Sequence, residues 1–176
     1  ILGNGPSLND TPLEALKKEK TIAVNKINRI YENTSWRPTY LVTRDIQEDE
    51  VDDIEESISE GVQCFISRDN IHPSEDNDEL FGERDNVEYF DTEVIPFSER
   101  QKALSENNVD AIWSEDIEEK ICGFGSSIAL AAQIAHYMGF EEIYFLGCDL
   151  FDIPTKHMLF DSGGDPSSVR NPDGST

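Results

Sequence analysis

The residues best suited to chemistry lie at the start of the chain, where two glycines, an asparagine and a serine follow two apolar residues. Their order is Ile1-Leu2-Gly3-Asn4-Gly5-Pro6-Ser7-Leu8. Glycine allows positive φ and lets an anionic ligand approach backbone N–H groups. This stretch therefore predicts a phosphate site made of loop amides together with Asn4 and Ser7. A strand-to-helix turn that binds nothing explains the same composition equally well.

The turn differs from the dinucleotide-binding fingerprint, because Leu8 stands where that fingerprint needs its third glycine. The first helix also begins late: Thr11 fits an N-cap, Pro12 the first helical position and Glu14 a capping box. We therefore expect a helix over residues 12–18, too far from the glycines for its dipole to hold a phosphate.

A second group of this kind precedes an apolar helix expected over residues 128–138. Gly125, Ser126 and Ser127 would supply backbone N–H groups, hydroxyls and the positive end of a helix dipole, which together suit an anion. An ordinary serine N-cap is the simpler interpretation of the same residues.

Polar residues also follow three apolar runs that read as strands. Asn25 ends the run 21–25, Arg44 and Asp45 follow the run 39–43, and Gly147 with Asp149 ends the run 142–149. The carboxyl ends of parallel strands meet at one edge of a sheet, where ligands of such folds bind. These side chains are therefore candidates for the same crevice as Asn4.

The fold follows from how the segments alternate. Apolar runs at 21–25, 39–43, 62–67, 87–90 and 142–149 are interspersed with helical patterns at 12–18, 48–60 and 128–138. This predicts an α/β, Rossmann-like domain with a mostly parallel sheet and helices on both faces. The run 142–149 is the clearest buried strand, and 69–86 is expected to be a loop. We expect a single domain over residues 1–176 that begins inside a strand and stops before its last element.

The formal net charge is −23, from 37 acidic and 14 basic residues. Such a surface repels nucleic acid and anionic lipid. An acidic interaction surface and adaptation to high salt both remain open, and the spread of the acids along the chain favours adaptation. Cys64, Cys122 and Cys148 are expected to be buried free thiols of a cytoplasmic protein. No apolar run reaches membrane-spanning length.

Three blocks in this order resemble the MptE-like family, named for 6-hydroxymethylpterin diphosphokinase, and the bacterial sialyltransferases that share the opening Gly-Asn-Gly-Pro-Ser-Leu. The blocks are residues 1–8 with 21–25, residues 37–40, and residues 125–127 with 147–149. The resemblance implies a Rossmann-like domain that binds a nucleotide at the carboxyl edge of its sheet.

In the sialyltransferases, the positions that correspond to Asn4 and Asn25 contact the cytidine monophosphate part of the donor, and Gly125, Ser126 and Ser127 would line the same site. This chain departs from those enzymes where two tyrosines steady the leaving phosphate, because Phe151 and His157 stand there. The catalytic histidine of those enzymes would come after Thr176.

The resemblance leads to a first hypothesis, a glycosyltransferase that uses a CMP-type nucleotide sugar and a glycan acceptor in surface-polysaccharide synthesis. The nucleotide site would consist of Gly3, Asn4, Gly5, Pro6, Ser7, Asn25, Arg44, Asp45, Gly125, Ser126, Ser127 and Gly147, with His157 and Asp149 as catalytic residues. No resident metal or certain cofactor is assigned, and a homo-oligomer is left open.

The second hypothesis is an ATP-dependent 6-hydroxymethyl-dihydropterin pyrophosphokinase, in which Asp149, Asp152 and Asp161 would hold Mg²⁺ through hard oxygen ligands. The third is a non-catalytic nucleotide-binding module. The absence of both tyrosines keeps this third hypothesis open.

The excess of acidic residues predicts that folding depends on salt. Low ionic strength leaves the self-repulsion of the chain unscreened, so the melting temperature should rise as salt increases from about 0.01 M to about 1 M. Differential scanning calorimetry across this range measures it. A melting temperature that does not change with salt would remove the salt-adaptation hypothesis.

Overall fold

The computed structural model describes residues 1–44, 46–68, 77–114, 116–123 and 126–149. Its main sheet is parallel, with strand order β1-β2-β3-β4. Leu2 extends the sheet beyond β1, because it forms isolated parallel β-bridges to Ala23 on one side and to Leu146 on the other. The strands of the main sheet are β1 (Ile22–Val24), β2 (Tyr40–Thr43), β3 (Gln63–Ser67) and β4 (Val87–Phe90). The predicted parallel α/β sheet is confirmed.

Helices connect the strands, and several of them are 3-10 helices. The α-helices are α1 (Val51–Ser59), α2 (Asn77–Phe81), α3 (Phe97–Ser105) and α4 (Ser127–Tyr137). The 3-10 helices are η1 (Pro6–Asp10), η2 (Leu13–Lys18), η3 (Ile27–Asn33), η4 (Glu48–Glu50) and η5 (Val109–Ile112).

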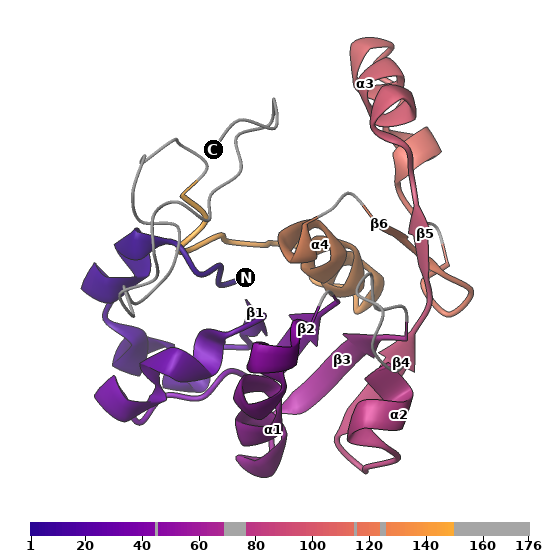
Figure 1. The fold of residues 1–176 in the computed structure, drawn as a ribbon. Coiled ribbons are helices and arrows are strands. Elements are labelled where there is room, and N and C mark those ends of the chain that lie inside the picture. Colours follow the sequence, from indigo (N-terminus) through magenta and orange to yellow (C-terminus); the bar gives the residue numbers. More distant parts are fainter. Residues whose placement is uncertain (45, 69–76, 115, 124–125, 150–176) are drawn as a thin grey trace, which may run out of the picture.

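Both faces of the sheet are covered, which explains why its strands are mostly apolar. Successive side chains of a strand point to opposite faces. In β1, Ala23 belongs to one buried cluster, while Ile22 and Val24 belong to the other. The first cluster includes Ile54 and Ile58 of α1, and the second includes residues of α4. Figure 1 shows α4 on one face of the sheet, with α1 and α2 on the other.

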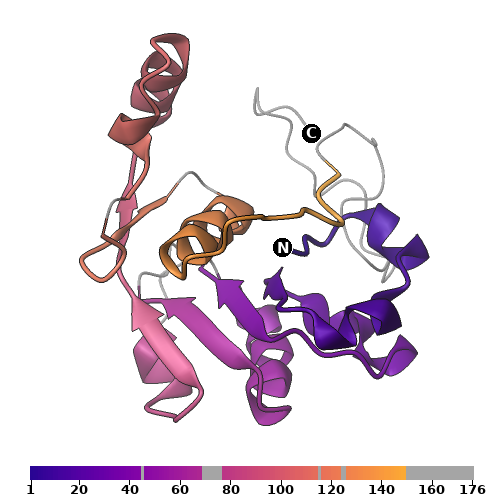
Figure 2. The ribbon, with the colours of Figure 1, turned by 180° about the vertical axis from the view of Figure 1, so that it is seen from behind.

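A smaller unit projects from the main sheet, as Figures 1 and 2 show. It consists of the parallel pair β5 (Thr92–Val94) and β6 (Ile121–Gly123), together with α3 and η5. We call this unit the arm. Gln133 of α4 joins the arm to the body: its Nε2 donates to the Cys122 carbonyl at 2.8 Å, and its Oε1 accepts from Ser114 N–H at 3.0 Å.

The segment 142–149 differs from its prediction. It pairs with the first residues of the chain, since Leu146 N–H donates to the Ile1 carbonyl and the Leu146 carbonyl accepts from Gly3 N–H, both at 2.9 Å. However, Tyr144 is 72% exposed and Phe145 is 49% exposed. The prediction of a buried strand was therefore wrong about burial, because an apolar run does not reveal whether it lies inside a sheet or at its margin.

Two local predictions were also wrong. Residues 13–18 form a 3-10 helix, with Pro12 at its N-cap position and no capping box. Residues 77–81 form helix α2 within the stretch expected to be a loop, while residues 69–76 lie outside the described part of the chain.

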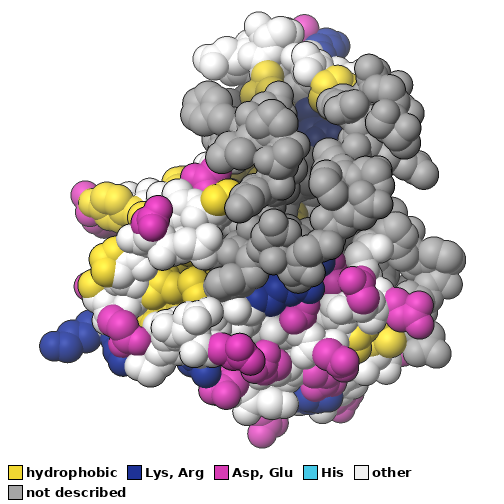
Figure 3. Space-filling model, turned by 60° about the vertical axis from the view of Figure 1, so that its left-hand side comes forward, with side chains coloured by type: hydrophobic (Ala, Val, Ile, Leu, Met, Phe, Trp, Pro, Cys, Tyr) yellow, Lys and Arg dark blue, Asp and Glu magenta, His cyan; other side chains and the backbone are white. Residues whose placement is uncertain are grey.

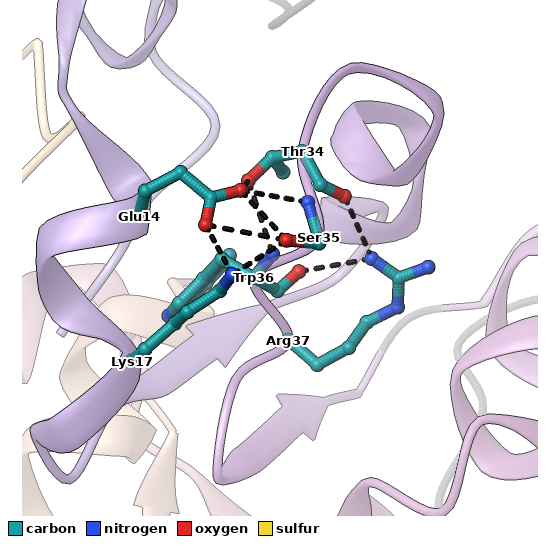
Figure 4. A network of polar contacts seen from close by, with 6 residues as sticks. All are labelled: Glu14, Lys17, Thr34, Ser35, Trp36 and Arg37. Carbon is teal, nitrogen blue, oxygen red and sulfur yellow. Dashed lines mark hydrogen bonds and ion pairs between the residues drawn. The ribbon is translucent and has the colours of Figure 1, made fainter.

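Glu14 makes long-range contacts in place of the expected capping box (Figure 4). Its Oε1 accepts from Thr34 Oγ1 and from Ser35 N–H, each at 2.8 Å, and its carboxylate pairs with Lys17. These contacts, with Lys17 as the largest cause, lower the pKa of Glu14 to about 2. The carboxylate therefore ties η2 to the loop that leads into β2.

Acidic side chains are scattered over the face shown in Figure 3, between fewer basic ones. This agrees with their spread along the sequence. Within the described residues, no helix is both long and apolar enough to cross a membrane.

The Glu14 contacts lead to a pH-dependent prediction. The pKa of Glu14 is lower in the folded state than in the unfolded state, where it is about 4.3, so its stabilising effect is present at neutral pH. The effect is lost as pH falls from about 4 toward 2. Glu14→Gln should lower the melting temperature at pH 7, and the difference should shrink as pH falls toward 2.

Glu19→Gln is the matched control, because Glu19 is exposed on the same segment. It corrects for the loss of one negative charge. Equal melting temperatures for the two variants at pH 7 would contradict the role of Glu14.

Candidate functional site

The topology creates a crevice beside Leu2. The chain adds β1, β2, β3 and β4 in order on one side of Leu2, and it returns at Leu146 on the other side. At such a switch point, the connections leave in opposite directions and open a crevice beyond the carboxyl ends of the strands. The glycine turn and residues 147–149 both lie at this place.

Gly3, Gly5 and Gly147 allow two backbone segments to touch. A Cβ on Gly3 would lie 2.5 Å from the Gly147 carbonyl oxygen, and a Cβ on Gly5 would lie 2.7 Å from the same oxygen. Gly147 has φ +61°, and its own Cβ would lie 2.8 Å from the Gly3 carbonyl oxygen. The glycines therefore serve a close approach of backbone to backbone.

Most backbone N–H groups of the turn donate hydrogen bonds to other groups of the protein. Gly3 N–H donates to the Leu146 carbonyl and Gly5 N–H to the Gly147 carbonyl, at 2.9 and 2.7 Å. Ser7 N–H donates to Asp149 Oδ2 at 2.8 Å, Leu8 N–H to the Gly5 carbonyl at 3.0 Å, and Pro6 has no N–H. The turn is thus poorly suited to cradle a phosphate with its amides, contrary to the expectation from its glycines.

Asn4 and Asn25 lie together at the crevice. Asn4 Nδ2 donates to the carbonyl of Val24, the residue before Asn25, at 3.1 Å. The Asn4 Oδ1 atom is buried and has no hydrogen-bond partner among the described residues. A buried acceptor without a partner is costly, so a ligand donor that reached it would gain a well-defined contact.

Asn25 is held by its neighbours in an unusual backbone conformation. Its φ is 50°, a left-handed value that asparagine adopts more easily than most residues. Its Oδ1 accepts from Ser127 Oγ at 2.9 Å and from Thr43 Oγ1 at 3.4 Å. Within the described residues, Asn25 Nδ2 donates no hydrogen bond, so its amide N–H groups are suited to a ligand acceptor.

The start of α4 completes this group of neutral polar residues. Ser126 is its exposed N-cap residue, and the Ser126 side chain makes no capping hydrogen bond. Ser127 reaches Asn25, as described above. Ala129 and Leu130 both donate to the Ser126 carbonyl, at 3.1 and 3.4 Å. Sequence reasoning missed Thr43, although its place as the last residue of β2 was a usable signal.

Arg44 lies at the same sheet edge but is directed inward. Its side chain is buried, and an ideal Cβ on Gly123 would lie 3.1 Å from Arg44 Nη1. Asn77 Nδ2 donates to the carbonyls of Arg44 and Ser67, at 3.1 and 2.7 Å, and thereby joins the ends of β2 and β3. Asn77 carried no signal in the sequence, because it follows a long polar stretch.

The thiols of Cys64 and Cys148 are poorly suited to nucleophilic chemistry. Burial raises the pKa of Cys64 to about 12, and it also raises the pKa of Cys148 beside Gly3. Cys64, Cys122 and Cys148 are all free thiols, although Cys148 is only partly buried.

Three predicted site residues, Asp45, Gly125 and His157, lie outside the described residues, as do Phe151, Asp152 and Asp161. Among the residues that are described, no group of three or more His, Cys, Asp or Glu side chains could hold a metal ion.

A separate apolar hollow lies at the opposite, amino-terminal edge of the central strands. Its volume is about 670 Å³, and its lining includes Leu16, Thr21, Phe140 and Tyr144. None of the polar residues of the crevice lines it. The hollow offers mainly apolar surface, so we base the functional site on the crevice.

Comparison with protein-family models identifies the family of this chain. The chain belongs to the MptE-like family, described as 6-hydroxymethylpterin diphosphokinase MptE-like, which matches residues 1–153. The family points to a nucleotide-related transferase or kinase-like role. Comparisons with curated proteins and with solved structures gave no match, so a relationship to the sialyltransferases stays a prediction.

The close approach at Gly3 generates a prediction. Gly3→Ala should force the Gly147 carbonyl away and lower the free energy of unfolding by about 1 to 3 kcal/mol, the usual cost of overpacking. The amide of Gly5, which donates to the same carbonyl, should exchange faster with solvent. Denaturant titration and hydrogen exchange measure the two effects.

Gly61→Ala is the control, because a Cβ there meets no atom within 4 Å and only the positive φ of +80° is strained. It should cost some stability without affecting exchange at Gly5. Unchanged exchange at Gly5 in the Gly3→Ala variant would show that the close approach is absent in solution.

Proposed function

We propose that the protein is a nucleotide-dependent transferase, and specifically a glycosyltransferase that uses a CMP-type sugar donor in surface-glycan synthesis. The proposal rests on the side-chain amides of Asn4 and Asn25, which lie at the switch point of the sheet. Asn4 offers a buried acceptor to which no described residue donates, and Asn25, one residue beyond the carbonyl that Asn4 contacts, offers a donor. A donor beside an acceptor suits the hydrogen-bonding edge of a base or a ribose.

Most backbone N–H groups of the glycine turn already donate hydrogen bonds within the protein. This favours a donor with a single phosphate. A di- or triphosphate is usually held by several N–H groups or by a metal ion. Here four N–H groups of residues 3–8 are bonded within the protein, and the described residues hold no three-carboxylate cluster. The start of α4 at Ser126 and Ser127 would be the place for the phosphate in this proposal.

The remaining roles follow the same proposal. Asn4, Asn25, Ser126 and Ser127 would hold the nucleotide, and His157 would act on the leaving phosphate or on the glycan acceptor. We place the reaction in the cytoplasm, where thiols such as Cys64 and Cys122 stay reduced.

A second candidate is an ATP-dependent 6-hydroxymethyl-dihydropterin pyrophosphokinase. The family description favours it. It would require Mg²⁺ and ATP at the crevice, with carboxylates of residues 149–161 as ligands. A non-catalytic nucleotide-binding module is the third candidate.

Ligand-dependent melting in about 1 M salt separates these candidates, because a ligand at about 100 times its Kd adds roughly 2.7 kcal/mol of stability. CMP alone should raise the melting temperature if the first proposal holds. A response to ATP with Mg²⁺, and none to CMP, would favour the pyrophosphokinase. No response to either ligand would overturn both enzymatic proposals.

Variants of the amide pair test the site itself. Asn4→Ala and Asn25→Gly should each weaken CMP binding by about 1 to 3 kcal/mol, because polar groups of the ligand lose their partners. Glycine is chosen at position 25 because alanine at φ 50° would itself add strain of about 1 to 2 kcal/mol. Isothermal titration calorimetry gives the affinities.

Asn33→Ala is the matched control, since Asn33 is exposed at the end of η3 and away from the crevice. It should bind CMP as the unaltered protein does. Normal CMP binding by both Asn4→Ala and Asn25→Gly would contradict the assigned site.

A further inference from the structure

Backbone hydrogen bonds between the glycine turn and the segment after Leu146 form a short ladder. Residues 3, 5 and 7 of the turn each donate an N–H across to this segment. Gly3 and Gly5 reach the carbonyls of Leu146 and Gly147, at 2.9 and 2.7 Å. The third acceptor is a side-chain oxygen and not a carbonyl: Ser7 N–H donates to Asp149 Oδ2 at 2.8 Å.

The Asp149 carboxylate therefore lies over the glycine turn. A Cβ placed on Gly5 would be 2.2 Å from Asp149 Oδ2, so the turn leaves room for this oxygen and for little else. Hydrogen bonds to a charged acceptor are stronger than those between neutral groups. The carboxylate occupies the position over the turn that an anionic ligand would otherwise take.

Asn4 stands between the residues that this ladder holds. Its neighbours Gly3 and Gly5 are fixed by the first two rungs, and the Ser7 rung closes the turn that follows. If the bond from Ser7 to Asp149 is lost, Pro6 and Ser7 can move away from Asp149, and the bond from Gly5 to Gly147 becomes the exposed end of the ladder. The Asn4 side chain, next to Gly5, is then held less firmly toward Val24.

We propose that Asp149 is a positioning residue: its carboxylate supplies the last acceptor of the ladder and so holds the glycine turn, and with it Asn4, in the form that binds nucleotide. The nucleotide part of this inference rests on the function proposed above. The role requires a hydrogen-bond acceptor at Oδ2, and it requires neither a proton transfer nor a metal ion at Asp149.

Amide hydrogen exchange tests the ladder without any ligand. Asp149→Ala should speed the exchange of the Ser7 amide by about tenfold or more, because its acceptor is gone. Asp149→Asn keeps an acceptor oxygen of the same reach and should change that exchange by less than about threefold. Asp10→Ala is the control, since Asp10 is an exposed acid on η1. Unchanged Ser7 exchange in Asp149→Ala would overturn the proposal.

Nucleotide affinity gives the second measurement, with CMP and ATP·Mg²⁺ as probes. Asp149→Ala should bind the preferred nucleotide about tenfold more weakly, and Asp149→Asn should recover most of the loss. Equal weakening by alanine and asparagine would show that the carboxylate acts on the ligand or on Mg²⁺, and would overturn the positioning role. If the unaltered protein binds neither probe, the proposed function fails, and the exchange measurement alone decides the role of Asp149.

Discussion

The contact between the backbones of Gly3 and Gly147 is the constraint on which the rest of the sheet edge depends. Leu2 bridges in parallel to Ala23 on one side and to Leu146 on the other. Beyond Leu2, the absence of side chains on Gly3 and Gly147 lets the two backbones touch. The glycine turn therefore lies against residues 147–149, and Asn4 contacts Val24, the residue before Asn25.

The chemistry of the crevice contrasts with that of the surrounding surface. The side chains proposed to contact the nucleotide, those of Asn4, Asn25, Ser126 and Ser127, are amides and hydroxyls, while the chain as a whole has a formal net charge of −23. A phosphorylated ligand that approaches such a protein meets long-range repulsion, which salt screens over roughly 10 Å at 0.1 M. Neutral groups at short range do not add to that repulsion. Contacts with the nucleotide would therefore be made by uncharged groups at short range, whereas the long-range repulsion of its phosphate depends on the salt concentration of the solvent.

Much of the fold could be predicted because its signals are local. Apolar runs gave the positions of β1 to β4, and parallel connectivity then placed Asn25 on the same edge as Asn4. The partner of Asp149 could not be predicted in this way, since Ser7 lies 142 residues away and no local pattern joins them. For the same reason, the glycines were interpreted as a phosphate cradle: their spacing is visible in the sequence, but the carbonyls that use the N–H groups are not.

The errors in secondary structure have a similar origin. The residue types at positions 11–14 fit a capping box, yet the Glu14 carboxylate accepts hydrogen bonds from Thr34 and Ser35 instead of the backbone N–H of the N-cap residue. A tertiary contact thus replaced a local one. The exposure of Tyr144 is likewise a property of position in the sheet, which hydrophobicity alone does not encode.

The arm has a consequence for how the molecule unfolds. Its own buried cluster consists of Ile95, Ala103, Ile112 and Cys122, whereas the clusters on the two faces of the main sheet are larger. So small a core stabilises its surroundings weakly, and weakly stabilised units open before the molecule as a whole does. The contacts of Gln133 and the burial of Ile121 of β6 in the core of the main sheet couple the arm to the body. We expect α3 and η5, which lie farther from that core, to open first and to leave the glycine junction intact.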